Sequence, residues 1–408
     1  MSATTLRRTG VASSVAALLA GLCFSASQAQ DTAAHADGWS RAEPQSLGVD
    51  AKQLDALGAA IRANQGALVD SLLIARCGSI VFDQRYPHDY AALYGAQARQ
   101  DTALSPKGAP GEANYYDADW RPYLHGTDLH TMQSVTKSIT SIVYGVAIER
   151  GDFKAGIDTP VLNYFKGQPV QAVDARKRHM TIRNLLTMRS GFDWPVGSGY
   201  TDYDNTSMRM ELSSDWAKFV IDQPMANEPG STFFYNDGAA ALLAYVFQKE
   251  TGQDLAQYAD KFLFAPLGIH HTYWRRGPHG LTDAQGGLYL RSEDLAKIGL
   301  LYLHKGMWNG HQLVSADWVQ QSLTGRETAP GRQGQYGYLW TIQPHGPAGD
   351  LIFAAHGFGG QGLLVDPKRN LIVVITGWSV PKGEGDTQKE VLERVVAATS
   401  DGSCPASE

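Results

Sequence analysis

Ser134 and Lys137 are spaced so that a hydroxyl nucleophile and a basic side chain would share one face of a helix. A serine hydroxyl needs a nearby base to take its proton, and a lysine can serve when burial lowers its pKa. The N-terminus of a helix also favours developing negative charge, because its backbone N–H groups are free. The pair therefore predicts acyl chemistry, with Lys137 largely neutral at mildly alkaline pH.

The helix itself is predicted from apolar periodicity over residues 134–150, and Gly151 follows as a stop. A second Ser-x-x-Lys match, from Ser379 to Lys382, serves as a control for the weakness of the motif. Pro381 would break a helix there and the match follows a strand-like run, so we interpret it as a surface turn.

Two further polar positions could complete such a centre. Tyr235 lies between the Pro229-Gly230 turn and an Ala-rich helix, and a phenol beside a lysinium can have a lowered pKa and exchange protons. His356 begins a glycine-rich turn in which a backbone N–H near Gly359 could face an oxyanion. The alternatives are a half-buried tyrosine and a glycine-rich hairpin with an incidental histidine.

Other catalytic signatures are absent from the sequence. It contains no Gly-x-Ser-x-Gly, His-Glu-x-x-His, P-loop or Gly-x-Gly-x-x-Gly motif. His125 with His130, and the pair His270-His271, are better interpreted as structural or solvated than as metal ligands. We therefore expect neither a metal nor a cofactor.

The elements that must position these residues are strands at both ends of the chain and helices between them. We expect a sheet part at about 45–90 and 275–400, a helical part at about 130–274, and an irregular insertion at 91–128. The predicted helices are 50–64, 134–150, 181–188, 214–223, 239–249, 254–264, 292–303 and 387–399, and the predicted strands are 71–75, 80–86, 336–342, 351–355, 362–365 and 371–376. The loop 192–207 and the insertion are expected to shape the pocket.

The first 29 residues resemble a secretory signal, with a short apolar core after Arg7 and Arg8. The predicted product, residues 30–408, is exported and is periplasmic or secreted. Its 33 Lys and Arg against 41 Asp and Glu argue against nucleic acid as a partner, and no apolar segment is long enough to span a membrane. Cys77 and Cys404 would remain, either paired in an oxidising compartment or as free thiols.

Taken together, the stretches around Ser134, Tyr235 and His356 resemble the serine β-lactamase and penicillin-binding-protein superfamily. The segments 181–194, 287–303 and 308–318 look like the branch that contains 6-aminohexanoate-dimer hydrolases and related esterases. The resemblance covers roughly residues 45–398, and the motifs occur in the family order. It implies an α/β (α+β) fold: an antiparallel sheet flanked by N- and C-terminal helices, with an inserted helical region.

The resemblance assigns roles residue by residue. Ser134 would be the acylated nucleophile, Lys137 its base and Tyr235 the proton shuttle to the leaving group. The oxyanion hole would use the backbone N–H of Ser134 and one from the Gly359 region, and His356 would orient substrate or tune Tyr235.

Two departures from the family pattern leave the substrate open. Asp237 stands where Tyr-x-Asn has its asparagine, which replaces a donating and accepting amide by an acceptor and would disfavour acidic substrates or shift neighbouring pKa values. The turn after His356 lacks the Lys-Thr-Gly form. We therefore expect a serine hydrolase of small esters or amides; the alternatives are a β-lactamase or D-Ala-D-Ala carboxypeptidase, and a non-catalytic cell-wall-binding protein with the same fold.

Overall fold

The computed structural model describes residues 38–63, 68–108, 111–328, 334–345, 349–380, 387–401 and 404. The predicted signal at 1–29, and Pro381 and Lys382 of the second Ser-x-x-Lys match, lie outside these residues. The described residues belong to one compact unit.

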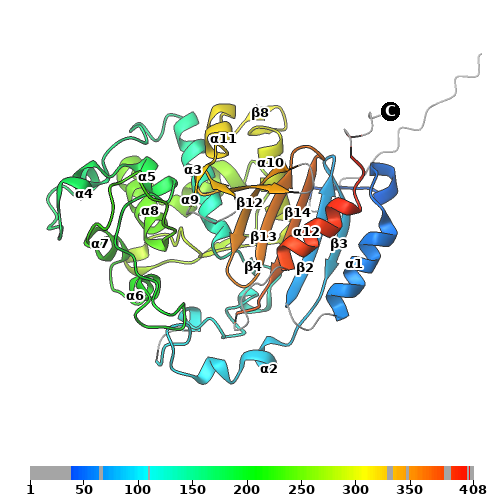
Figure 1. Cartoon of the computed structure of the whole chain (residues 1–408), viewed down its shortest axis with the longest axis horizontal. Coiled ribbons are helices and arrows are strands. Elements are labelled where there is room, and N and C mark those ends of the chain that lie inside the picture. Colours follow the sequence, from blue (N-terminus) through cyan, green and yellow to red (C-terminus); the bar gives the residue numbers. More distant parts are fainter. Residues whose placement is uncertain are drawn as a thin grey trace, which may run out of the picture. The chain divides into compact units, whose positions relative to one another are not determined.

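A nine-stranded sheet is the centre of the fold, in the order β1-β3-β2-β14-β13-β12-β11-β10-β9 (Figure 1). Neighbouring strands pair antiparallel, except that β1 and β3 are parallel. Strands from the N-terminal and C-terminal parts of the chain meet where β2 pairs with β14. The strands are β1 (Ser40–Arg41), β2 (Val69–Arg76), β3 (Ser79–Arg85), β9 (Arg326–Glu327), β10 (Gln335–Tyr336), β11 (Thr341–His345), β12 (Asp350–Gly357), β13 (Gln361–Asp366) and β14 (Leu371–Gly377).

Helices cover both faces of this sheet, which is why its central strands are almost continuously apolar. Leu72 and Ile74 of β2 pack with the terminal helices, whereas Leu73 and Ala75 point into the larger core on the other face. Figure 1 shows α1 and α12 over one face, and the inserted helices to the other side of the sheet. The helices are α1 (Ala51–Ala63), α2 (Tyr90–Tyr94), α3 (Val135–Glu149), α4 (Ala175–His179), α5 (Ile182–Leu186), α6 (Thr206–Glu211), α7 (Trp216–Ile221), α8 (Asp237–Thr251), α9 (Leu255–Ala259), α10 (Ser292–Leu303), α11 (Ala316–Ser322) and α12 (Thr387–Ala397).

Helix α3 is enclosed on all sides, because every residue from Val135 to Ala147 is buried. Its apolar residues Ile139, Ile142 and Val143 belong to the large core, as the periodicity predicted. Burial all round fixes the helix rigidly, and its N-terminus is therefore a stable platform for a reacting group.

The structure contains short strands that the sequence did not predict, and one of them, β4 (His130–Thr131), lies just before α3. A three-stranded sheet pairs β4 with β6 (Leu288–Leu290), and β6 with β5 (Tyr273–Trp274). A separate hairpin joins β7 (Met307–Trp308) and β8 (His311–Gln312). Two-residue strands show no period-2 pattern, which is why the sequence gives no sign of them.

The predicted antiparallel sheet flanked by terminal helices is confirmed, but two boundaries were wrong. The predicted strand 336–342 is broken between β10 and β11, where Leu339 has φ +63° and its N–H donates to Leu186 O. The predicted helix 254–264 splits into α9 and a π-helical turn, Asp260–Phe264. The irregular insertion 91–128 contains only the end of α2 and three short 3-10 turns among its described residues.

Cys77 and Cys404 form a disulfide, with Cα atoms 5.6 Å apart. It joins the turn between β2 and β3 to the tail that follows α12. Of the two alternatives left by the sequence, the paired state is the one in this structure.

Candidate active site

Ser134 occupies the N-cap position of α3 and is half-buried. The chain reaches it through Gln133, which has the left-handed φ of +47° that a non-glycine residue rarely adopts. Val135 N–H donates to Met132 O, and Lys137 N–H donates to Ser134 O. The Ser134 N–H itself has no hydrogen-bond partner among the described residues, so it can meet an incoming oxyanion.

Lys137 lies one helical turn further on, and its side chain is 2% exposed. Its Nζ is 2.9 Å from Ser134 Oγ, 2.8 Å from the main-chain oxygen of Gln285 and 2.7 Å from Asp237 Oδ1. An ammonium has three N–H donors, and these three oxygens, together with the phenol of Tyr235, surround it.

The charge of Lys137 differs from the sequence prediction. Burial lowers the pKa of Lys137, but the carboxylate of Asp237 and the oxygen of Tyr235 raise the pKa by more, so the net shift is upward. The prediction of a largely neutral Lys137 at mildly alkaline pH is therefore wrong, because it considered the apolar helix and not the carboxylate.

Tyr235 joins the same group of side chains from the turn before α8. Its phenol is hydrogen-bonded to both Ser134 and Lys137, and Lys137 Nζ lies 5.0 Å from its ring centroid. Burial raises the pKa of Tyr235, and the opposing effect of Lys137 does not cancel the rise. The expected lowering of the phenol pKa is therefore wrong, and Tyr235 stays protonated at neutral pH.

Asp237 is the first residue of α8, and Asn236 caps this helix by accepting the N–H of Ala239 at 2.8 Å. The N-terminus of a fifteen-residue helix stabilises a carboxylate. Gly238 allows this end to approach α7 and its neighbours, because a Cβ there would lie 2.5 Å from the Trp194 ring. The Asp237 carboxylate therefore contacts Lys137, a role that goes beyond the substrate contact expected from the sequence.

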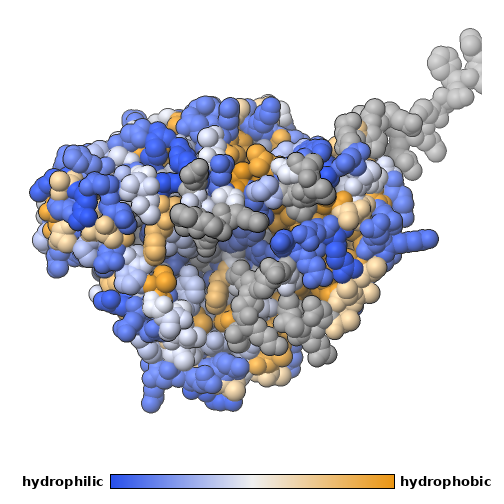
Figure 2. Space-filling view, viewed as in Figure 1, coloured by the Kyte–Doolittle hydropathy of each residue, from blue (hydrophilic) through white to orange (hydrophobic). Residues whose placement is uncertain are grey.

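A cavity of about 360 Å³ opens above Ser134 and Tyr235. Its walls include Tyr200 from the loop 192–207, as predicted, and Phe233, Leu339 and Phe358. The sequence did not anticipate the contribution of the chain between α11 and β11. Figure 2 shows one face of the molecule, on which hydrophilic residues dominate and smaller hydrophobic areas lie between them.

His356 lines this cavity from β12, and its Nδ1 lies 2.5 Å from Gln388 Oε1 of α12. Burial lowers the pKa of His356, so the imidazole is neutral at pH 7. Gly359 lines a separate small cavity, whereas Gly357 and Phe358 of the same segment line the cavity above Ser134. An oxyanion donor from the Gly359 region stays a prediction.

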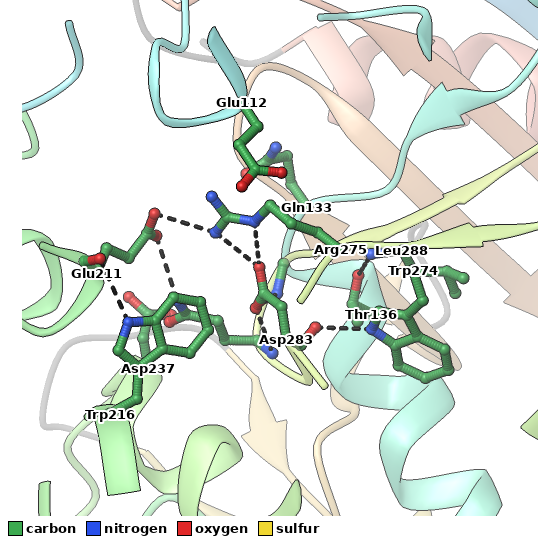
Figure 3. Close-up of polar contacts among 12 residues, drawn as sticks. Glu112, Gln133, Thr136, Glu211, Trp216, Asp237, Trp274, Arg275, Asp283 and Leu288 are labelled. Carbon is green, nitrogen blue, oxygen red and sulfur yellow. Dashed lines mark hydrogen bonds and ion pairs between the residues drawn. The ribbon is translucent and has the colours of Figure 1, made fainter. Parts of the chain in front are cut away.

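Next to Ser134 and Asp237 lies a smaller cavity, backed by a buried ionic network (Figure 3). Arg275 bonds Asp283 at 2.6 Å and Glu211 at 3.0 Å. Asp283 Oδ1 accepts the N–H groups of Gln285 and Gly286 at 3.2 and 3.1 Å. The network therefore fixes the loop whose Gln285 carbonyl accepts from Lys137.

Of the four histidines that the sequence raised as possible metal ligands, His125 and His130 make side-chain contacts. His130 is buried between Asp70 and Thr131, and His125 contacts Asp119 at the surface. His270 and His271 are exposed. In the part of the chain that the structure describes, no group of three or more acidic, histidine or cysteine residues could hold a metal ion.

A family model described as Beta-lactamase matches residues 54–397. The chain belongs to the Beta-lactamase family. Helices of the described ranges include none with the length and apolar character that crossing a membrane requires.

Three similar proteins set this Beta-lactamase-family chain among hydrolases. It is 24% identical over 304 residues to the 6-aminohexanoate-dimer hydrolase of Paenarthrobacter ureafaciens, which covers 69% of this chain and 73% of that protein. It is 28% identical over 158 residues to Esterase EstB of Burkholderia gladioli, covering 36% and 39%. A putative 6-aminohexanoate-dimer hydrolase from Bacillus anthracis shares the fold, with a TM-score of 0.63, 18% identity and 88% of each chain covered.

Several residues of this Beta-lactamase-family site were missed from the sequence. Gln285 contributes a main-chain carbonyl, which any residue type would provide, so no signal marks it. Arg275 and Glu211 lie far apart in the chain and look like ordinary charged residues. Tyr115 was covered only by the general expectation that the insertion shapes the pocket, and it lines the smaller cavity.

Proposed function

We propose that this hydrolase cleaves small esters or amides through an acyl-enzyme on Ser134. The observation that carries the proposal is the contact of Ser134 Oγ with Lys137 Nζ at 2.9 Å, beneath an open cavity and at the N-terminus of a buried helix. Lys137 and Tyr235 are the groups in position to move protons between the serine, the leaving group and the hydrolytic water.

The cavity favours uncharged substrates. No arginine or lysine is among the described residues that line the two cavities, whereas Glu211 and Asp237 line the smaller one. A substrate carboxylate would lack a cationic partner there and would meet negative charge. These features support neutral esters and amides over β-lactams and D-Ala peptides, whose recognition involves a carboxylate.

The test is covalent labelling of the mature protein with a serine-directed fluorophosphonate, followed by intact mass and peptide mapping. Ser138 is a matched control, because it also lines the cavity and its Oγ donates to Leu339 O at 2.6 Å. We expect Ser134→Ala to abolish labelling and ester turnover, and Ser138→Ala to retain the label. A label that persists in Ser134→Ala would exclude the assignment.

Export is a separate part of the proposal. It rests on the signal-like residues 1–29, and the Cys77–Cys404 disulfide supports it because such bonds persist in oxidising compartments. We expect mass spectrometry of the protein from the periplasm or medium to show an N-terminus near residue 30. Uncleaved protein confined to the cytoplasm would contradict this part.

A further inference from the structure

The three hydrogen bonds of Lys137 present a difficulty for its role as a simple base. A protonated amine that already donates to Ser134 Oγ, Gln285 O and Asp237 Oδ1 has no lone pair with which to take the serine proton. The Gln285 carbonyl cannot receive a proton at ordinary pH, and neither can the protonated phenol of Tyr235, which also contacts Lys137. Among the neighbours of the ammonium, the Asp237 carboxylate is therefore the group that can take a proton from it.

We propose that Asp237 is the proton acceptor of the acylation step, and that it receives through Lys137 the proton that leaves Ser134. The contact at 2.7 Å is within hydrogen-bond reach, and both side chains are shielded, at 2% and 10% exposure. The inference rests on the proposed acylation of Ser134.

The step balances in protons and charge. One N–H proton of Lys137 moves to Asp237 Oδ1, and the amine turns about its Cε–Nζ bond so that the released lone pair faces Ser134 Oγ. The lone pair then takes the Ser134 hydroxyl proton. The serine oxygen forms a bond to the substrate carbonyl carbon, whose π electrons pass to the carbonyl oxygen. On collapse, the oxyanion re-forms the carbonyl and the bond between the carbonyl carbon and the leaving group breaks. Tyr235 protonates the leaving group, Lys137 reprotonates Tyr235, and Asp237 returns its proton to Lys137.

The surroundings make the carboxylate the suitable end of this relay. A buried ion pair is less favoured than one in water, so the neutral amine and carboxylic acid lie closer in free energy to the ion pair than they do in solution. A substrate that fills the cavity and excludes water increases this effect. Asp237 is also reached without any movement, since its oxygen already contacts Nζ.

Other titratable groups face the pair and must be separated from it. Tyr235, Tyr200 and Tyr115 have pKa values raised mainly by burial or by nearby carboxylates, so they do not ionise at neutral pH. Glu211 is compensated by Arg275. His356 lines the larger cavity with Ser134 and Tyr235, and burial lowers the pKa of its imidazole.

The experiment measures the rate of fluorophosphonate labelling of the full mature chain against pH. In the native protein the relay does not require a neutral Lys137, so we expect labelling at neutral pH, and the acidic limb of its rate is the reference for the variants. In Asp237→Asn, Lys137 must itself be neutral, and we expect the acidic limb to move to higher pH by about 2 units or more. The same shift is expected in a His356→Asn background, which removes the imidazole titration.

The opposite results would overturn the relay. If Lys137 must instead lose its proton to solvent, Asp237→Asn removes the charge that holds the proton and moves the limb to lower pH. An unchanged limb would likewise reject the role of Asp237. Either result leaves Ser134 labelling intact, so the relay fails separately from the proposed function.

If Asp237→Asn folds but is not labelled at any pH, the relay is tested with the Asp237→Glu variant. Recovery of labelling with the native acidic limb supports the relay, because a carboxylate is again within reach of Lys137. Failure of this conservative variant to recover labelling would overturn it. Near-ultraviolet circular dichroism of each variant reports the folded state.

Discussion

Lys137 and Lys177 are both buried lysines, yet their environments set opposite pKa shifts. Lys177 Nζ donates to three main-chain oxygens, Gln171 O at 2.9 Å and Ile221 O and Gln223 O at 2.7 Å each. Burial lowers its pKa to about 8, whereas the pKa of Lys137 is raised. Lys137 has a carboxylate and a serine hydroxyl where Lys177 has main-chain oxygens, and the carboxylate of Asp237 is the main group that raises the pKa of Lys137.

This comparison shows that burial alone does not predict the protonation state of an active-site lysine. The main-chain carbonyls accept the hydrogen bonds of Lys177 but do not neutralise its charge. Asp237 accepts a hydrogen bond from Lys137 and also neutralises its charge. The two carboxylates that act on Lys177 from a distance, Asp222 and Asp174, pair instead with Lys218 and Arg176. We infer that Lys177 holds a loop together and that Lys137 carries chemistry.

The largest expected difference between the two lysines is in reactivity. Lys137→Ala should reduce the rate of Ser134 labelling by about 10³-fold, because it removes the group through which the serine proton leaves. Lys177→Ala should leave the labelling rate of the folded protein within a few-fold of the native rate. Fluorophosphonate kinetics on both variants would measure this, and equal losses would break the functional distinction.

Stability should change in the opposite order. Lys177→Met leaves three buried carbonyls without their donor and should lower the free energy of unfolding by about 3 kcal/mol. The native pKa near 8 lies below the unfolded value of 10.5, so the unfolded state binds more protons between these values and native stability rises with pH there. Denaturant unfolding at pH 8 and pH 10 should show this rise in the native protein and its loss in Lys177→Met; a rise that persists would exclude Lys177 as its source.

The smallest predicted effect concerns the aromatic ring beside each lysine. Tyr235→Phe keeps an aromatic ring near Lys137 but removes the hydroxyl that bonds Ser134 and Lys137. The variant then resembles Lys177, whose Nζ lies 5.9 Å from the centroid of the Phe192 ring. We expect ester turnover to fall by about 10²-fold with little change in unfolding. Steady-state kinetics would measure it, and turnover at the native rate would remove Tyr235 from the proton path.

The fold was predictable to the extent that each element carries its own pattern. The buried helix after Ser134, the hairpin around Cys77 and the apolar strand Leu371–Gly377 have periodicity or turn residues that mark them. The break at Leu339 was not predictable, because a positive φ at a leucine is imposed by its contacts with Leu186 and Ser138.

The site was predictable in its members but not in its charge state. Ser134, Lys137 and Tyr235 are brought together as their motifs indicated, and Asp237 was recognised as an unusual residue. That its carboxylate contacts Lys137 depends on how α8 meets α3, which no local pattern encodes. The network of Arg275, Asp283 and Glu211 depends likewise on distant segments.

The central claim is that Asp237 keeps Lys137 charged in the resting protein. Lysine methylene chemical shifts measured by NMR across pH 5 to about 10 test it directly, with the Lys137 signal assigned by its loss in Lys137→Arg. We predict an ammonium at Lys137 throughout this range, while Lys177 titrates near pH 8. A titration of Lys137 at or below the midpoint of Lys177 would contradict the account.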